Sequence, residues 1–183
     1  FGALGRAVAE ALLQDGFRVA AVDRTRALEG VGNPSYLAMG EVDLTSPDST
    51  SRAFARVRDR WGQLDVLVNI AGGFRWQRLD AGTLDVWDEM YAVNLRTAVV
   101  SSSAALPHLL ESTNAAIVNI GAGAALKTAA AGMGAYTASK AGVQKLTESL
   151  AQELKDKGVT VNAILPATID TPANRRDMPH EDF

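Results

Sequence analysis

The chain has 183 residues, of which 47% are hydrophobic and 21% are charged, and this is typical of one globular domain with a sizeable core. Its net charge of -3 gives no electrostatic reason to expect nucleic acid or an anionic membrane as a partner. The absence of cysteine excludes disulfides and thiolate metal sites, and no signal peptide or membrane-spanning apolar run is present. We therefore expect a cytoplasmic protein without a metal, although a segment before Phe1 could carry a targeting signal.

Helical and strand patterns alternate from the first residues onward. A helical pattern over 6–15 ends at Gly16, and the apolar run FRVAAVD at 17–23 predicts a buried strand. A weaker strand pattern at 36–42 precedes Ser46-Pro47, a favourable N-cap and first position for a helix that ends before Gly62. The remaining patterns predict strands at 64–73, 115–123 and 159–166, a helix capped by Thr83, and long helices at 95–112 and 134–157.

The order of these elements predicts the fold class. Apolar strands that alternate with helices indicate an α/β fold of Rossmann type, in which a doubly wound parallel sheet lies between helices in three layers, α/β/α. A single domain over residues 1–183 is the simplest organisation, because no repeat or linker interrupts the chain. The chain opens on a helical pattern without an initiator methionine and stops at MPHEDF. We therefore expect that the first strand and a C-terminal segment are missing.

Residues near the first two predicted elements point to a dinucleotide. Ligands of such sheets bind beyond the carboxyl ends of the strands, and the glycines of FGALG (1–5) would let the backbone approach a pyrophosphate at a helix N-terminus. A glycine turn without a ligand is the alternative. Asp23 ends the next strand, where a carboxylate could hold a ribose diol or merely cap a turn. Arg24 beside it could bind a 2'-phosphate, so we expect NAD(H), with NADP(H) possible.

A tyrosine and a lysine stand near the start of the helix predicted over 134–157. Tyr136 and Lys140 are four residues apart, which places them on one face of that helix. The ammonium group is expected to lower the pKa of the phenol, making Tyr136 a proton donor and acceptor near neutral pH. The same spacing arises by chance in many helices, so the pair needs support from the rest of the chain.

Six short motifs supply that support, because their order resembles that of the short-chain dehydrogenases/reductases over almost the whole chain. The motifs are FGALG (1–5), VDLT (42–45), NIAGG (69–73), VNL (93–95), YTASK (136–140) and PATIDTP (166–172). Ala3 departs from the family loop, which has a glycine there, while Gly5 matches its last glycine. The resemblance implies an oxidoreductase that transfers a hydride with a nicotinamide cofactor.

The resemblance also implies the roles of individual residues. Tyr136 is the acid/base, Lys140 binds the nicotinamide ribose and lowers the pKa of the tyrosine, and Asn94 helps to organise a proton-relay water. Asp43 holds the adenine amino group. The implied cofactor contacts are Gly2, Leu4, Gly5, Asp23, Arg24, Asp43, Leu44, Asn69, Ala71, Gly72, Tyr136, Lys140, Pro166, Ile169 and Thr171.

One position departs from the family in a way that bears on the substrate. Most members carry a serine thirteen residues before the tyrosine, and this chain has Gly123 there, with no serine or threonine in 119–127. Loss of such a donor costs carbonyl reduction about 2.7–4 kcal/mol, by analogy with oxyanion-hole deletions. Either catalysis is lost, or the substrate does not need the donor.

A closer resemblance favours the second explanation. AGAALKTAAAGMGAY (122–136), NIAGGF (69–74) and the segment from Leu165 to Phe183 resemble the dihydropteridine reductase branch, which also lacks the serine. This implies an NADH-dependent reductase of a dihydropteridine-like acceptor with Tyr136 as proton donor. Asn94 follows the general family instead. The alternatives are a broader reductase of another activated C=N, C=C, quinone or carbonyl substrate, and a non-catalytic NAD(H)-binding sensor or scaffold.

Three further features have two interpretations each. Phe74 and Trp76 follow the NIAGG turn and could stack on a planar substrate or simply pack against the protein. Arg175 and Arg176 could close over the site or be solvated charges. The long helices are rich in small and apolar residues, and in the family such helices pair across a two-fold axis, although a missing C-terminal segment could cover them instead. We expect a homodimer or homotetramer that acts on a small molecule.

Overall fold

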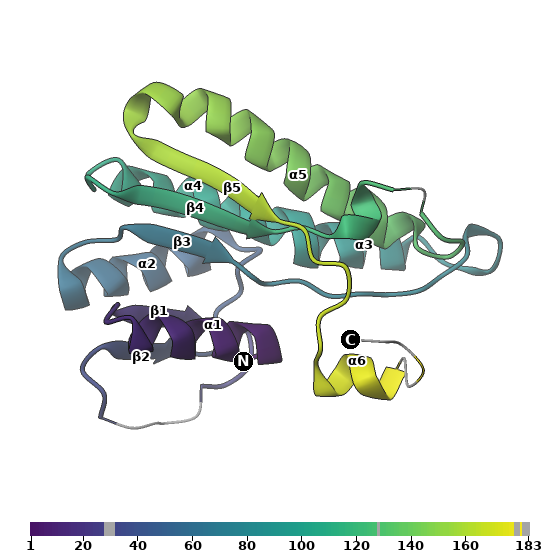
Figure 1. The fold of residues 1–183 in the computed structure, drawn as a ribbon, viewed down its shortest axis with the longest axis horizontal. Coiled ribbons are helices and arrows are strands. Elements are labelled where there is room, and N and C mark those ends of the chain that lie inside the picture. Colours follow the sequence, from purple (N-terminus) through teal and green to yellow (C-terminus); the bar gives the residue numbers. More distant parts are fainter. Residues whose placement is uncertain (28–31, 128, 178–179, 181–183) are drawn as a thin grey trace. The chain divides into compact units, whose positions relative to one another are not determined.

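The computed structural model describes residues 1–27, 32–127, 129–177 and 180 (Figure 1). The described residues form two compact units, one of Phe1–Asp43 with Thr168–Phe183 and one of Leu44–Ala167. Each unit contains one parallel sheet.

The unit that contains the N-terminus has a two-stranded sheet and two helices. α1 (Ala3–Gln14) packs against β1 (Val19–Val22), and β1 pairs in parallel with β2 (Tyr36–Met39). The chain leaves α1 through Gly16, whose φ of 85° suits a residue without a side chain. α6 (Pro172–Asp177) is a helix of less than two turns.

The Leu44–Ala167 unit contains a three-stranded parallel sheet in the order β3-β4-β5. A π-helical turn over Tyr91–Arg96 joins two of its helices. The strands and α-helices of this unit are α2 (Pro47–Trp61), β3 (Val66–Asn69), α3 (Asp85–Met90), α4 (Thr97–Leu109), β4 (Ala115–Ile120), α5 (Gly134–Leu154) and β5 (Val159–Ile164).

The bounds of α2 follow from residues that are recognisable in the sequence. Ser46 accepts a hydrogen bond from the backbone N–H of Ser49 at 3.4 Å, and Pro47 stands at the first helical position. Gly62 ends the helix with a φ of 80°. The apolar face of α2 is buried through Phe54 and Val57.

Helices cover one face of the β3-β4-β5 sheet. α4 contacts β3 and β4, α5 contacts β4 and β5, and α2 packs against α4. Ile117 on β4 has no exposed surface, and burial alternates along β5, where Val161 is buried and Thr160 is exposed. Figure 1 shows the three strands side by side, with α5 alongside β5. Because the strands are parallel, their carboxyl ends lie at one edge of the sheet.

The predicted α/β class with parallel strands is confirmed, and every predicted strand is present with shorter bounds. The predicted helix cap at Thr83 is wrong, because α3 begins after Leu84, which has no side-chain cap hydrogen bond. Among the residues that the structure describes, no helix is both long and apolar enough to cross a membrane.

Candidate active site

Three predicted residues, Gly72, Asn94 and Lys140, meet beyond the carboxyl ends of β3 and β4. Lys140 projects from α5 and is only 6% exposed, and its Nζ donates a hydrogen bond to Ile120 O, at the end of β4, at 2.8 Å. Gly72 lies beside it in the turn after β3, since a Cβ added to this glycine would lie 3.3 Å from Lys140 Nζ and 2.7 Å from Asn94 Oδ1. Because Gly72 has no side chain, the Asn94 amide and the Lys140 ammonium can both lie close to the backbone of this turn.

Asn94 fixes that turn from the π-helical segment. Its Oδ1 accepts from the N–H of Gly73 at 2.9 Å, and its Nδ2 donates to Gly73 O at 3.1 Å. The same Nδ2 donates to Ser139 Oγ at 3.0 Å, and Ser139 donates to Tyr136 O at 2.7 Å. Asn94 thus links the turn after β3 to the first turns of α5. π-helical turns are frequent at functional sites because the extra residue redirects a side chain.

Tyr136 lies half-buried in the first turn of α5. Its ring meets that of Phe74 edge to face, with centroids 5.0 Å apart and an interplanar angle of 81°. Burial raises the pKa of Tyr136 above its ordinary value of 10.0. The lowered pKa expected from the spacing of Tyr136 and Lys140 is therefore wrong for this structure. The phenol is consequently protonated at neutral pH and can act as a proton donor.

Burial also sets the charge state of the neighbouring lysine. It lowers the pKa of Lys140 from 10.5 to about 8, because a charged ammonium is poorly solvated there. An ammonium carries three N–H donors, and one of them is engaged by Ile120 O. The remaining donor capacity suits hydroxyl groups such as those of a ribose.

The departure at Gly123 leaves this segment without a hydroxyl donor. The backbone N–H of Gly123 already donates to Pro166 O at 2.8 Å, and an added Cβ would lie 3.3 Å from the same oxygen. Residues 119–127, all described, contain no hydroxyl side chain. A carbonyl that needs polarisation therefore finds no hydroxyl donor on this segment.

Asn69 and Trp76 have protein partners of their own. Asn69 Nδ2 donates to Asn119 Oδ1 at 2.8 Å and to Ser102 Oγ at 3.2 Å, so its side chain ties β3 to β4 and α4. The indole N–H of Trp76 donates to Ala131 O at 2.9 Å. Trp76 therefore packs against the protein, which is one of the two roles expected for it. A cofactor contact of Asn69 stays a prediction. Ser139 and Gly73 were missed as individual residues, although both lie inside recognised motifs.

Asp23, Arg24 and Asp43, which are expected near the adenosine of the cofactor, lie in the Phe1–Asp43 unit, whereas Leu44 and the NIAGG turn lie in the Leu44–Ala167 unit. Asp23 follows β1, and its Oδ1 accepts from Thr25 N at 2.8 Å and from Thr25 Oγ1 at 2.9 Å. Partial burial acts to raise the pKa of Asp23, whereas the hydrogen bonds from Thr25 act to lower it, and the carboxylate is charged at neutral pH. Arg24 is exposed, and a Cβ on Gly2 or Gly5 would meet no described atom within 4 Å.

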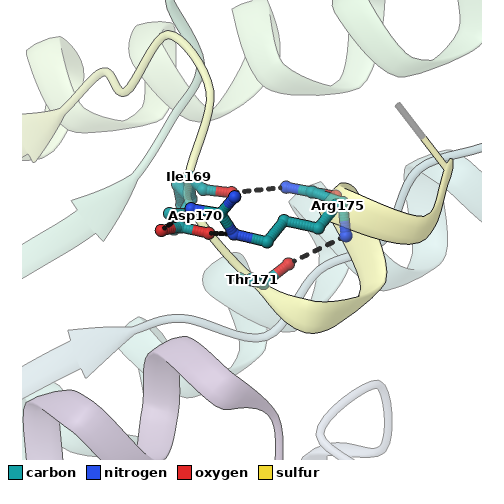
Figure 2. A network of polar contacts seen from close by, with 5 residues as sticks. Ile169, Asp170, Thr171 and Arg175 are labelled. Carbon is teal, nitrogen blue, oxygen red and sulfur yellow. Dashed lines mark hydrogen bonds and ion pairs between the residues drawn. The ribbon is translucent and has the colours of Figure 1, made fainter. Parts of the chain in front are cut away.

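The PATIDTP segment ends in a network of its own (Figure 2). Thr171 Oγ1 accepts from Asn174 N at 3.1 Å, which caps α6, and Ile169 O accepts from Asn174 Nδ2 at 2.8 Å. Arg175 forms two hydrogen bonds with the carboxylate of Asp170, at 2.6 and 2.7 Å, and both side chains are exposed. Arg175 is therefore an ion-paired surface residue in this structure. The roles implied for Ile169, Thr171, Asp43, Leu44, Ala71, Pro166 and Leu4 at a cofactor stay predictions.

Comparison with known proteins places these features in a family. The model of the short chain dehydrogenase family matches residues 1–182. The 2-(R)-hydroxypropyl-CoM dehydrogenase of Xanthobacter autotrophicus is 34% identical over 187 residues, which cover 96% of this chain and 74% of that protein. An uncharacterized oxidoreductase of Staphylococcus saprophyticus is 28% identical over 92% of this chain and 75% of its own length.

Solved structures give the same picture. A short chain dehydrogenase from Burkholderia cenocepacia J2315 in complex with NADP has a TM-score of 0.85 and 36% identity, and the match covers 97% of this chain and 74% of that chain. The ligand-free aldohexose dehydrogenase of Thermoplasma acidophilum has a TM-score of 0.83 and 30% identity. That match covers 95% of this chain and 66% of that chain. The chain thus spans between two thirds and three quarters of these proteins.

Proposed function

Because this chain belongs to the short-chain dehydrogenase family of oxidoreductases, we propose that it transfers a hydride between NAD(P)(H) and an organic acceptor, with Tyr136 as the proton donor. One observation carries the proposal. Asn94 and Lys140, both buried, converge on the Gly72–Gly73 turn, and Ser139 connects this group to the backbone of Tyr136. An ammonium held at this depth, where burial opposes its charge, is a feature typical of functional sites.

Each side chain has a task in the proposed reaction. The bound nicotinamide supplies the hydride chemistry. Tyr136, protonated at neutral pH, gives its proton to the acceptor atom on which negative charge develops when the hydride adds to the other end of the reduced bond or conjugated system. Lys140 directs its remaining N–H donors to the cofactor ribose and, when charged, stabilises the phenolate that remains. Asn94 holds the Gly72–Gly73 turn in place around both groups. The glycines Gly2 and Gly5 at the start of α1 and the carboxylate of Asp23 fit a dinucleotide, and Asp23 favours NAD(H) over NADP(H).

For the acceptor we propose an electron-poor ring of the quinonoid dihydropteridine type. A delocalised ring of this kind accepts a hydride without a polarising hydroxyl, and 119–127 offers none. The N–H of Gly123 is also engaged by Pro166 O. Phe74, half exposed beside the phenol, offers an aromatic surface against which a flat substrate can lie.

A second candidate is a secondary alcohol and its ketone. The support for it comes from two relatives, the hydroxypropyl-CoM dehydrogenase of Xanthobacter autotrophicus and the D-beta-hydroxybutyrate dehydrogenase of Rhizobium meliloti, which is 33% identical over 76% of this chain. Because residues 119–127 carry no hydroxyl side chain, the carbonyl oxygen of such a substrate would depend on the Tyr136 phenol for its hydrogen bond.

The experiment follows oxidation of NADH and NADPH with quinonoid dihydropterin, simple quinones and short ketones as acceptors. We expect the fastest turnover with dihydropterin, and a loss of about 10²–10⁴-fold in Tyr136→Phe. Tyr91→Phe is the matched control, since Tyr91 is 51% exposed. Turnover of ketones but not dihydropterin would favour the second candidate. Saturable cofactor binding without hydride transfer to any acceptor would instead indicate a sensor or scaffold.

A further inference from the structure

Trp76 holds two segments of the Leu44–Ala167 unit together. Its indole N–H donates to Ala131 O at 2.9 Å, and the next residue, Gln77, donates its backbone N–H to Gly132 O at 2.8 Å. Gly132 has a φ of 82°, and a Cβ added there would overlap the indole ring of Trp76. The ring therefore lies directly on a glycine whose conformation and surroundings both exclude a side chain.

A second tryptophan supports the same segment from α3. A Cβ on Gly134 would lie 3.3 Å from Cη2 and Cζ2 of Trp87, which is tighter than an ordinary contact. The backbone of 131–134 is thus contacted by one indole at Gly132 and by another at Gly134. This segment leads directly into α5, whose third residue is Tyr136.

The exposure of Trp76 indicates that this arrangement is more than core packing. Trp76 is 60% exposed and so lies outside the core, yet its indole is held by a hydrogen bond and by its contact with Gly132. Phe74 lies two residues before Trp76 on one segment, and Tyr136 lies two residues after Gly134 on the other. The rings of Phe74 and Tyr136 meet at 5.0 Å. Phe74 and Tyr136 thus lie on the two segments that the contacts of Trp76 and Gln77 join.

We propose that Trp76 is a positioning residue, which locks the segment carrying Phe74 to the turn before α5 and so fixes an aromatic wall beside the Tyr136 phenol. The wall selects acceptors that present a flat, apolar ring face. The consequence for turnover rests on the proposed function, whereas the locking of the two segments does not. The proposal therefore has two separate tests.

The first test needs no turnover and follows amide hydrogen exchange of residues 131–137 in the whole chain. Trp76→Ala and Gly132→Ala should each speed exchange about tenfold, the loss expected for one hydrogen bond and its local ordering. Trp76→Phe keeps an aromatic ring but loses the donor, and it should lie between Trp76→Ala and the wild type. Phe17→Ala, at an aromatic residue of the Phe1–Asp43 unit that is 49% exposed, is the control and should leave exchange unchanged. Unchanged exchange in Trp76→Ala would overturn the proposal.

The second test compares kinetic constants in the same variants. In Trp76→Ala, KM for the ring acceptor should rise about tenfold or more while KM for the cofactor stays the same, because displacement of a positioning group weakens one substrate site. The preference for ring acceptors over short ketones should fall with it. A parallel rise in both KM values would mean a merely structural role and would contradict the proposal. Full activity in Tyr136→Phe would refute the proposed function and leave the exchange result standing.

Discussion

Lys140 is an ammonium group that the fold holds in a position unfavourable to its charge. Its pKa falls from 10.5 to about 8, so in the native protein it binds a proton less tightly than in the unfolded chain. Below pH 8 both states are protonated and the native state carries the whole penalty, about 3 kcal/mol. Between pH 8 and 10.5 only the unfolded state retains the proton, so the stability contributed by this residue rises with pH.

We therefore expect Lys140→Met to abolish hydride transfer and to stabilise the cofactor-free protein at pH 7, by about 1–3 kcal/mol after the lost hydrogen bond to Ile120 O is counted. Urea unfolding measured from pH 7 to 10.5 is the test, and the gain should shrink steadily above pH 8. Lys145→Met is the control, since the Lys145 side chain is 75% exposed. If Lys140→Met were less stable than the wild type at pH 7, burial of the Lys140 charge would not destabilise the native protein, and the prediction would be wrong.

Gly72 and Gly73 are adjacent glycines with different surroundings, and they form a matched pair. A Cβ at Gly72 would lie 2.7 Å from Asn94 Oδ1, whereas one at Gly73 would meet Val93 Cγ2 at an ordinary 3.6 Å. Gly72→Ala should push the Asn94 amide away and lower kcat about 100-fold, because small displacements of catalytic groups are costly. Gly73→Ala should change kcat only a few-fold. Equal effects of the two substitutions on kcat would show that the close contact between Gly72 and Asn94 does not matter for catalysis.

Asp23 is the residue on which the expected cofactor preference depends. Its charged carboxylate should hold the ribose diol of NAD(H) and repel the 2'-phosphate of NADP(H). Asp23→Ser should lower the ratio of kcat/KM for NADH over NADPH by about tenfold or more. The exposed Asp15 supplies the control variant Asp15→Ser. If the wild type already prefers NADPH, Arg24 rather than Asp23 sets the preference.

At the scale of elements, Ser139 joins α5 to the π-helical turn. Its hydroxyl accepts from Asn94 Nδ2 and donates to Tyr136 O. Ser139→Ala removes one acceptor from a buried amide, so we expect a loss of about 1–3 kcal/mol in unfolding free energy and a fall in kcat. Ser51→Ala, at an exposed position of α2, should do neither. The prediction fails if kcat is unchanged in Ser139→Ala, since Asn94 would then hold its position alone.

The elements also show which parts of the fold and site were predictable. Ser46, Gly62 and Gly158 act through local backbone geometry, so the helix ends beside them can be located from the sequence. The π-helical turn around Asn94 was not predicted, because one inserted residue hardly disturbs the apolar periodicity of a helical segment. The motifs identified the site residues, but the side-chain partners of Asn69 depend on tertiary contacts with β4 and α4. Such partners have no local sequence signal.

The same limit explains the pKa of Tyr136. Sequence spacing indicated a nearby cation, which lowers the pKa of a phenol, but it contained no information about burial, which raises it. Burial dominates in this structure. The contact between Phe74 and Tyr136 was likewise not predictable, since the two residues lie far apart in the sequence and no motif links them.

At the scale of the whole molecule, the remaining question is assembly. Val99, Ser103 and Leu110 form a stripe along one side of α4, and Val99 and Leu110 are 42% and 45% exposed. An apolar stripe on a helix that a single chain leaves open suits a symmetric interface, in which the same surface meets its copy. We propose a homodimer or homotetramer that uses this stripe.

Ser103→Arg places a charge at the centre of the stripe and should give a monomer in size-exclusion chromatography with light scattering. Ser51→Arg, at an exposed position of α2, should leave the assembly intact. A wild-type protein that runs as a monomer at all concentrations would refute the proposal, and an oligomer unaffected by Ser103→Arg would move the interface to another surface.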